Sequence, residues 1–260
     1  MVQGVALTVQ PFVPTDVNGV MKLLFLPILF LLSSLAAAAE VQPVELHQQL
    51  ALPAGATDKV VALTLDACGG GFDADLAHFL IEHRIQATIF VTRRWIRHNP
   101  EGLALLKAHA DLFDIEDHGA NHVPAIIGAD RNVYGIAGAA DMKQLKREVS
   151  GGADAVKAAT GTMPHWYRGA TGEYDPEALT AIEAMGYKVA GFSVNADNGA
   201  TLEKKKIVAR LKKVRSGDII IAHLNKPESD TGEGMAEGLQ LLLDHGFHFM
   251  RLDAAEVRPR

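Results

Sequence analysis

Two histidines stand four residues apart in the segment His118-Gly-Ala-Asn-His122. This spacing puts two imidazoles on one face of a helical turn, where both can bind one divalent metal ion. The pattern alone is weak evidence, because the chain has 11 histidines and loop histidines are often structural. Its position adds weight, since it directly follows a segment that is predicted to be a strand.

Other reactive side chains also follow predicted strands: Asp66, Arg168, Asp197 and His223. The run VVALTLD ends in Asp66, and the run DIIIAH ends in His223. The carboxyl ends of parallel strands share one edge, which is where active sites form in barrels and open sheets. We therefore expect these side chains to meet the histidine pair in one site.

The elements that must position this site alternate along the chain. The predicted strands are residues 60–66, 87–92, 112–116, 165–168, 188–192, 218–223 and 247–252. The predicted helices are residues 74–83, 101–109, 141–159, 176–185, 202–214 and 234–245, the third of them interrupted near Gly151 and Gly152. This alternation predicts a parallel sheet with helices outside it, in a single α/β domain over residues 59–260 that follows an arm at 40–58.

The order of these residues resembles the five motifs of the polysaccharide deacetylases, the NodB-homology domain of carbohydrate esterase family 4. The matching segments are Thr64-Leu65-Asp66, His118-xxx-His122, Tyr167-Arg168-xxx-Gly172, Asp197 and Ile221-Ala222-His223. The resemblance runs from about residue 60 to 252. It implies a distorted, incomplete (β/α) barrel.

The resemblance also implies a metal-dependent hydrolysis. A divalent metal ion, commonly zinc, would be held by His118 and His122 and would polarise an acetamide carbonyl. Asp66 would be the general base that takes a proton from the attacking water. An ion pair with Arg168 would hold it in place.

The remaining family roles fall on three residues. His223 would protonate the leaving amine, and Asp197 would keep His223 charged. The backbone N–H of Thr171 would stabilise the oxyanion. The chain is thus expected to release acetate from an N-acetylated glycan such as peptidoglycan, a chitin-like polymer or poly-N-acetylglucosamine. An O-acetyl glycan esterase and an inactive glycan-binding domain remain as alternatives.

The first motif departs from the family pattern, in which a second aspartate supplies the third metal ligand. Here Ala67 stands in its place, and it cannot bind a metal. We favour Asp73, which a flexible glycine run would bring to the metal, although Asp73 also suits the N-cap of the next helix. Cys68 is the alternative ligand or a small buried residue. Asp66 itself could ligate at the expense of its role as base, and a site with two histidines or no metal also remains open.

The third and fourth motifs are altered as well. The loop after Arg168 lacks the family's prolines, so its contact to an oxyanion is in question. Placing the fourth motif's acid at Asp197 requires a shift of one residue, and the tryptophan that usually follows is missing. Trp166 and Tyr167 either replace that aromatic wall of the sugar groove or belong to the core.

The amino-terminal region predicts export. Residues 21–39 combine a basic start, an apolar run and an Ala-x-Ala end, which indicates a signal peptide cleaved after Ala39. Residues 1–20 have no place in that scheme, and we interpret them as an extension upstream of the true start at Met21. The alternative is a long n-region, which ordinarily carries more positive charge. The mature protein is expected to be periplasmic or secreted, without a stable membrane anchor.

The composition excludes several classes. The 260 residues carry a net charge of −6 with a sequence pI near 6.0, which gives no general attraction to nucleic acid. The single cysteine, Cys68, excludes a disulfide within the chain. A basic stretch at residues 204–215 fits a solvated helix face.

Overall fold

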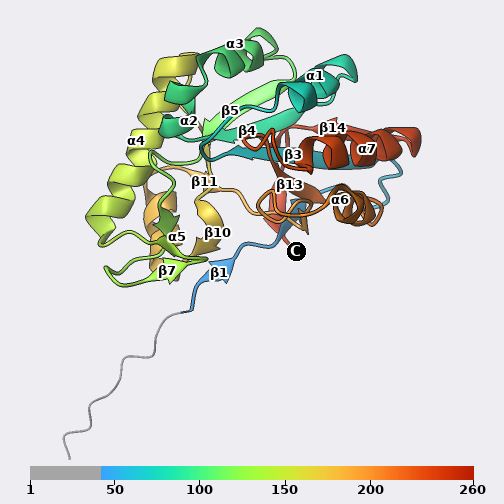
Figure 1. Cartoon of the computed structure of the whole chain (residues 1–260). Helices are drawn as coiled ribbons and strands as arrows, with labels where there is room; N and C mark the ends of the chain where they lie inside the picture. The colour runs from blue at the N-terminus through green and yellow to red at the C-terminus, as the bar shows by residue number, and fades with distance from the viewer. Residues whose placement is uncertain (1–41) are drawn as a thin grey trace, which may run out of the picture. The chain divides into compact units, whose positions relative to one another are not determined.

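A computed structural model describes residues 42–260 of the chain. Its centre is a parallel sheet in the order β11, β9, β5, β4, β3, β13, β12 (Figure 1). Within residues 42–260, the two edge strands β11 and β12 do not pair with each other, so the barrel is not closed. The strands of this sheet, including β14 beside β3, are β3 (Lys59–Ala67), β4 (Ala87–Val91), β5 (Phe113–Asp117), β9 (Trp166–Tyr167), β11 (Lys188–Val189), β12 (Val194–Asn195), β13 (Ile219–His223) and β14 (Phe247–Met250). The predicted incomplete (β/α) barrel is confirmed.

Helices cover the outer side of this sheet (Figure 1). They are α1 (Ala74–Glu82), α2 (Arg93–His98), α3 (Pro100–Ala108), α4 (Met142–Thr160), α5 (Pro176–Ala184), α6 (Lys204–Leu211) and α7 (Thr231–Asp244). The largest core cluster joins strand residues such as Leu63 and Ile220 to helix residues such as Leu76 and Leu239, all at most 1% exposed. Burial on both faces explains why the strand sequences are continuous apolar runs.

The register of the sheet brings its carboxyl ends level. Asp66 at the end of β3 lies opposite His223 of β13, and Asp117 of β5 lies opposite Tyr167 of β9. Strand β14 pairs with the first half of β3, whereas β4 pairs with the second half. The catalytic candidates thus leave neighbouring strands at one edge of the sheet.

Three smaller sheets accompany the main sheet in residues 42–260. One contains β1 (Val44–Glu45), β10 (Ala170–Tyr174) and β6 (Pro124–Ala125); the others pair β2 (Gln48–Leu50) with β15 (Val257–Pro259), and β7 (Asn132–Val133) with β8 (Ile136–Ala137). The side chain of Gln48 also bonds the backbone of Val189 and Gly191. The described part of the arm therefore packs into the same compact unit.

Helix α4 differs from its prediction, since it runs without interruption through Gly151 and Gly152. A Cβ on Gly152 would lie 2.0 Å from Asp117 Oδ1 and 2.6 Å from the carbonyl carbon of Gly119. The glycine is thus required by the close approach of the loop after β5, not by a helix break. Helix α2 and the short strands outside the main sheet were not predicted, because they are too short for a periodic signal.

The predicted signal peptide at residues 21–39 and the extension at 1–20 lie outside the described residues. Within residues 42–260, none of the helices combines the length and apolar character that crossing a membrane requires.

Candidate functional site

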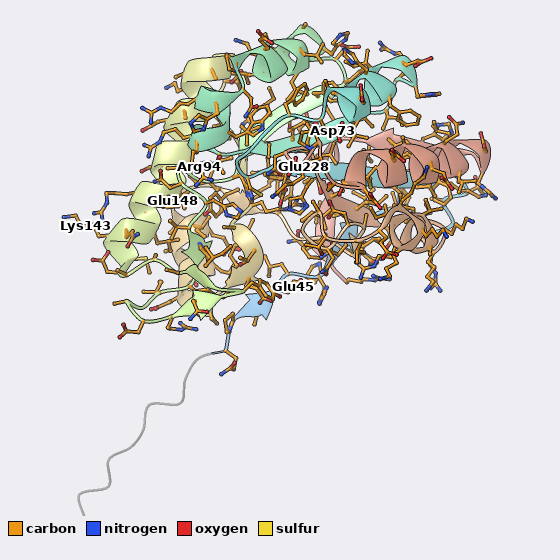
Figure 2. All side chains as sticks on the ribbon, viewed as in Figure 1. Glu45, Asp73, Arg94, Lys143, Glu148 and Glu228 are labelled. Carbon is orange, nitrogen blue, oxygen red and sulfur yellow. The ribbon has the colours of Figure 1, made fainter. Side chains whose placement is uncertain are left out.

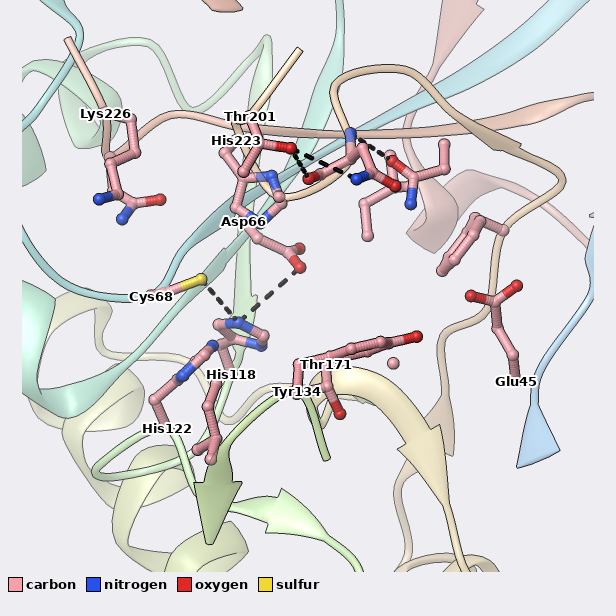
Figure 3. Close-up of a pocket in the computed structure, with 18 residues that line it drawn as sticks. Glu45, Asp66, Cys68, His118, His122, Tyr134, Thr171, Thr201, His223 and Lys226 are labelled. Carbon is pink, nitrogen blue, oxygen red and sulfur yellow. Dashed lines mark hydrogen bonds and ion pairs between the residues drawn. The ribbon is translucent and has the colours of Figure 1, made fainter. Parts of the chain in front are cut away.

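A cavity of about 420 Å³ opens at the carboxyl ends of the central strands (Figure 3). Its lining includes most of the predicted site residues: Asp66, Cys68, His118, His122, Thr171 and His223. Arg168 and Asp197 are fully buried behind this lining. Arg168 contacts Asp66, and Asp197 contacts His223. The cavity therefore gathers residues from β3, β13, the loop after β5 and β10.

Asp66 and Arg168 form a buried ion pair. Arg168 Nη1 donates to Asp66 Oδ1 at 2.8 Å and to Thr64 Oγ1 at 2.9 Å, while Nη2 donates to a backbone carbonyl of the β11–β12 segment at 3.2 Å. The guanidinium also lies over the ring of Phe90, 4.3 Å from its centroid. A buried pair of this kind is costly unless its remaining polar atoms are bonded, and here several are. The aspartate is therefore fixed in one orientation.

The charges around Asp66 set its protonation state. Burial raises the pKa of this carboxyl, but Arg168, His118 and His223 lower it more, so the net shift is downward. Asp66 is consequently ionised at neutral pH and able to accept a hydrogen bond from a water in the cavity. Its Oδ2 lies 3.8 Å from His118 Nε2.

His223 faces the cavity with its other side held by Asp197. The ring nitrogen Nδ1 lies 3.0 Å and 3.1 Å from the two carboxylate oxygens, and the backbone N–H of His223 donates to Oδ2 at 2.9 Å. Thr231 donates to the same carboxylate. Burial lowers the pKa of His223, but the hydrogen bond to Asp197 and the thiol of Cys68 raise it well above its usual value. His223 is therefore a protonated donor at neutral pH.

Three possible metal ligands come together in the described residues, namely Cys68, His118 and His122. Their ligand atoms all lie within 4.8 Å of one another. Cys68 Sγ lies 3.3 Å from His118 Nε2 (Figure 3). His118 Nδ1 lies 2.7 Å from the carbonyl oxygen of Arg168, which can only accept. Nδ1 thus donates to this oxygen, which leaves Nε2 as the ring atom that can bind a metal once its own proton has left. A thiolate with two imidazoles is a donor set that fits zinc.

Charge at this group also suits a cation. Burial raises the pKa of the Cys68 thiol, but His118, His122 and His223 lower it well below its usual value. Burial lowers the pKa of His118, but Asp66 and Cys68 raise it to about 9. At neutral pH a proton therefore occupies Nε2 of His118, between the negative charges of Cys68 and Asp66, and a divalent cation that binds there would displace it.

Asp73, the favoured third ligand in the sequence analysis, lies outside this group. Its Oδ1 accepts the backbone N–H of Leu76 at 2.9 Å, so Asp73 is the N-cap of α1 (Figure 2). The glycine loop, residues 68–71, precedes Asp73, and a side chain donates a hydrogen bond to each of its four carbonyl groups. These bonds hold the loop in a position that keeps Asp73 away from the histidine pair. The geometry therefore favours the alternative, Cys68, which precedes the glycines.

The histidine loop, residues 118–123, is held by carboxylates that the sequence analysis missed. Asp117 Oδ1 accepts the N–H of Gly119 at 2.7 Å. Glu148 Oε1, from α4, accepts the backbone N–H groups of Asn121 at 2.7 Å and Val123 at 3.1 Å (Figure 2). A signal for Glu148 exists in the sequence, since it interrupts the apolar face of α4 between residues 145 and 149.

Two site residues have backbone conformations that L-residues rarely adopt. His122 has φ +66° and Thr171 has φ +71°. Such conformations cost about 1 kcal/mol or more and gather at functional sites. Thr171 lies where the register between β10 and β6 shifts, at the edge of the cavity.

The aromatic surface of the cavity comes from residues that the sequence analysis did not single out. Trp166 is 4% exposed and Tyr167 is fully buried, so both belong to the core, as one of the two readings expected. Phe192 and the exposed Tyr134, between β7 and β8, line the cavity instead. The basic stretch includes α6, whose apolar face is buried and whose lysines are mostly exposed.

Comparisons with known proteins bear on the family and the fold of this chain. A family model for polysaccharide deacetylases matches residues 54–190. No curated protein matches the sequence. PdaA of Bacillus subtilis, a family 4 carbohydrate esterase, has a TM-score of 0.60 and 22% identity, with coverage of 75% of this chain and 80% of its own.

Two further solved structures are similar. A mutant of the Bacillus subtilis peptidoglycan deacetylase PdaC has a TM-score of 0.60 and 22% identity, covering 76% of this chain and 89% of its own. A family 4 pseudoenzyme from Bacillus anthracis has a TM-score of 0.59 and 19% identity, covering 76% of this chain and 65% of its own. At these identities the likeness establishes the fold.

Proposed function

The chain belongs to the polysaccharide deacetylase family, and from that premise we propose that it hydrolyses N-acetyl groups of an amino-sugar glycan to amine and acetate. The observation that carries the proposal is that a proton acceptor and a proton donor line the same cavity. Asp66, ionised and held by Arg168, can accept a proton. His223, protonated and held by Asp197, can donate one. Hydrolysis of an amide needs both.

A divalent metal ion would be held by Cys68, His118 and His122, and when bound it would supply Lewis-acid polarisation of the carbonyl and a more acidic water. Asp66 orients the attacking water and takes its proton as the oxygen adds to the acetyl carbon. His223 gives a proton to the nitrogen as the carbon–nitrogen bond breaks. Acetate and a free amine leave, and proton transfer from Asp66 to His223 through solvent restores the starting state.

Two neighbouring residues would support these transfers. Arg168 keeps Asp66 ionised and turned toward the cavity through the 2.8 Å contact. The backbone N–H of Thr171 is proposed to stabilise the negative oxygen of the tetrahedral intermediate, because Thr171 lines the cavity in a fixed left-handed conformation. Phe192 and Tyr134 offer apolar surface for a sugar ring.

Export is part of the proposal. Glycans of the cell envelope lie outside the cytoplasm, and the pattern of residues 21–39 is that of a signal peptide. Intact-mass measurement of the protein purified from its native host should give a chain that begins at Glu40. A chain that retains residues 21–39 would contradict the proposed cleavage.

Acetate release from the purified protein tests the activity. Peptidoglycan, chitin oligomers and poly-N-acetylglucosamine are compared with O-acetylated xylan. Asp66→Asn and His223→Ala should each abolish acetate release, because one removes the base and the other the acid. His118→Ala should also lose the bound metal. Release from xylan alone would favour the O-acetyl esterase.

A pair of matched variants tests the ligand set. Cys68→Ser should lower zinc content and acetate release, whereas Asp73→Asn should change neither, because Asp73 only caps α1. About one zinc per chain that is lost together with activity on chelation supports the enzyme. Glycan binding without acetate release, with or without zinc, would show an inactive binding domain instead.

A further inference from the structure

The glycine loop is bonded to side chains at four consecutive carbonyl groups. Thr92 Oγ1 donates to the carbonyl of Cys68 at 2.6 Å, and Trp95 Nε1 donates to that of Gly71 at 2.8 Å. Between them, the side-chain amides of Asn225 and Asn99 donate to the carbonyls of Gly69 and Gly70, the latter at 3.0 Å. Three of these donors lie on or beside α2, and the fourth follows β13.

Other parts of the chain approach the glycines of this loop closely. A Cβ on Gly69 would lie 2.7 Å from Arg94 Nη2, and one on Gly71 would lie 3.0 Å from the ring of Pro227. Gly70 has φ +84°, and a Cβ there would lie 3.0 Å from the carbonyl oxygen of Asn225. The run is therefore packed tightly between two parts of the chain, and its glycines do not make it flexible.

Strand β3 ends at Ala67, whose side chain has no atom that can bind a metal. Cys68, which lies near both histidines, is the first residue of the loop that follows, and holding an unsupported loop in one position costs conformational entropy. The four side-chain donors remove that freedom. The first of them acts on the carbonyl of Cys68 itself, only a few bonds from the thiol.

We propose that these donors form a cradle that fixes Cys68 as the third metal ligand in place of the carboxylate that Ala67 lacks, and that Thr92 and Asn225 are its positioning residues. This inference rests on the proposed metal site. Asn225 follows His223 by two residues, so it links the ligand loop to the strand that carries the proposed acid. The cradle thereby sets the thiol and the acid relative to one another.

The proposal has a consequence for the choice of metal. Thiolate and imidazole ligands favour zinc and other thiophilic ions over magnesium and manganese. Cys68→Asp should shift this preference toward manganese, because it returns a carboxylate to the loop.

Cobalt binding provides a readout that is independent of activity. The metal is removed from the purified protein by chelation, and Co²⁺ is titrated while the thiolate-to-cobalt charge-transfer absorption is recorded. Thr92→Val should weaken cobalt affinity by about tenfold or more and reduce the band, as is usual for loss of an outer-shell contact. Thr92→Ser, which keeps the hydroxyl donor, should restore both.

Graded variants and a matched control separate positioning from general destabilisation. Asn225→Ala, which frees the next carbonyl, should have a smaller effect than Thr92→Val, and Asn99→Ala a smaller one still. Thr92 also caps α2 by accepting the N–H of Trp95. Asp141→Ala removes the corresponding cap of α4, which accepts from Gln144, and should leave cobalt binding unchanged.

The outcomes distinguish the two proposals. If the wild-type protein shows no thiolate band and Cys68→Ser binds cobalt equally well, the proposed ligand set is wrong. If the wild-type protein shows the band and Cys68→Ser loses it, but Thr92→Val keeps wild-type affinity and absorption, the cradle alone is wrong. A Thr92→Ser variant that behaves like Thr92→Val would likewise contradict the role of the hydroxyl.

Discussion

The glycine loop and the histidine loop carry the three candidate ligands, and they are held by opposite chemistry. In the glycine loop the carbonyl groups are bonded, and the partners are neutral donors such as Thr92 and Asn99. In the histidine loop the N–H groups are bonded, and the partners are the buried carboxylates of Asp117 and Glu148. The side chains that hold the two loops thus bond opposite halves of the backbone, its carbonyls in one loop and its N–H groups in the other.

This difference decides how each loop should respond to change. The carboxylate of Glu148 accepts several N–H groups, so its removal leaves more than one buried donor unpaired. A neutral donor satisfies one carbonyl, which has a second lone pair and tolerates loss better. Variants in the support of the histidine loop should therefore be more damaging than those of the glycine loop.

Removal of Glu148 is expected to have the largest effect. Glu148 is 3% exposed and bonds both backbone N–H groups and the side chain of Asn121. Glu148→Ala should lower the free energy of unfolding by about 3 kcal/mol, since it orphans these donors. Zinc affinity should fall by about tenfold or more. Urea unfolding and zinc titration measure the two effects.

Glu148→Gln serves as the control for this prediction. The amide keeps one oxygen that can accept from both backbone N–H groups, so most of the stability and zinc affinity should return. Wild-type zinc affinity in Glu148→Ala would show that the histidine loop keeps its shape without the carboxylate.

Gly152→Ala should reverse the usual helix preference. Replacing glycine by alanine inside a helix ordinarily stabilises it by about 1 kcal/mol. Here the new methyl group would lie 2.0 Å from Asp117 Oδ1, so overpacking should instead cost about 2 kcal/mol. Thermal or urea unfolding tests the sign. In Gly151→Ala the closest atom would be 3.2 Å away, and the loss should be much smaller.

The sequence predicted the residues that stand at the ends of long strands. Asp66 and His223 follow apolar runs whose period and length identify β3 and β13, and parallel pairing then places their side chains together. The fold followed from the same alternation. The strands, the helices and the residues that follow the strands can each be recognised within one short segment of the sequence.

The arrangement of the candidate third ligands could not be predicted in the same way. The sequence favours Asp73 over Cys68, because a carboxylate keeps the family's ligand set and a run of glycines suggests a flexible segment. Its rigidity comes from Thr92 and Asn225, which are 24 and 156 residues away from the carbonyls that they bind. Such contacts exist only after the chain has folded. The same holds for Gly152, whose role depends on a loop from another part of the chain.

A smaller effect concerns the carboxylates that precede the histidine loop on β5. Burial and Asp114 raise the pKa of Glu116 to about 9, although two backbone N–H groups that it accepts lower it. Because the folded-state pKa lies above the usual 4.5, Glu116 contributes stability that is present at low pH and is lost as the pH rises toward 9.

Glu116→Gln should therefore stabilise the protein by about 1 kcal/mol at pH 8 and make the unfolding free energy less dependent on pH. The amide oxygen can still accept both N–H groups, and its nitrogen can donate to the carboxylate of Asp114, whose charge raises the pKa of Glu116. Urea unfolding at several pH values measures the slope. An equal slope in both proteins would contradict the assignment to Glu116.

The smallest effect is expected in the glycine loop, from Asn99→Ala. Asn99 donates to the carbonyls of Gly70 at 3.0 Å and Trp95 at 3.1 Å, and both contacts join uncharged groups. Their loss should cost about 0.5 to 1 kcal/mol, the usual net worth of a neutral hydrogen bond. The cost should be equal at pH 5.5 and pH 8.5, because none of these groups titrates in that range. A cost that changed between the two pH values would contradict the assignment of these contacts to uncharged groups.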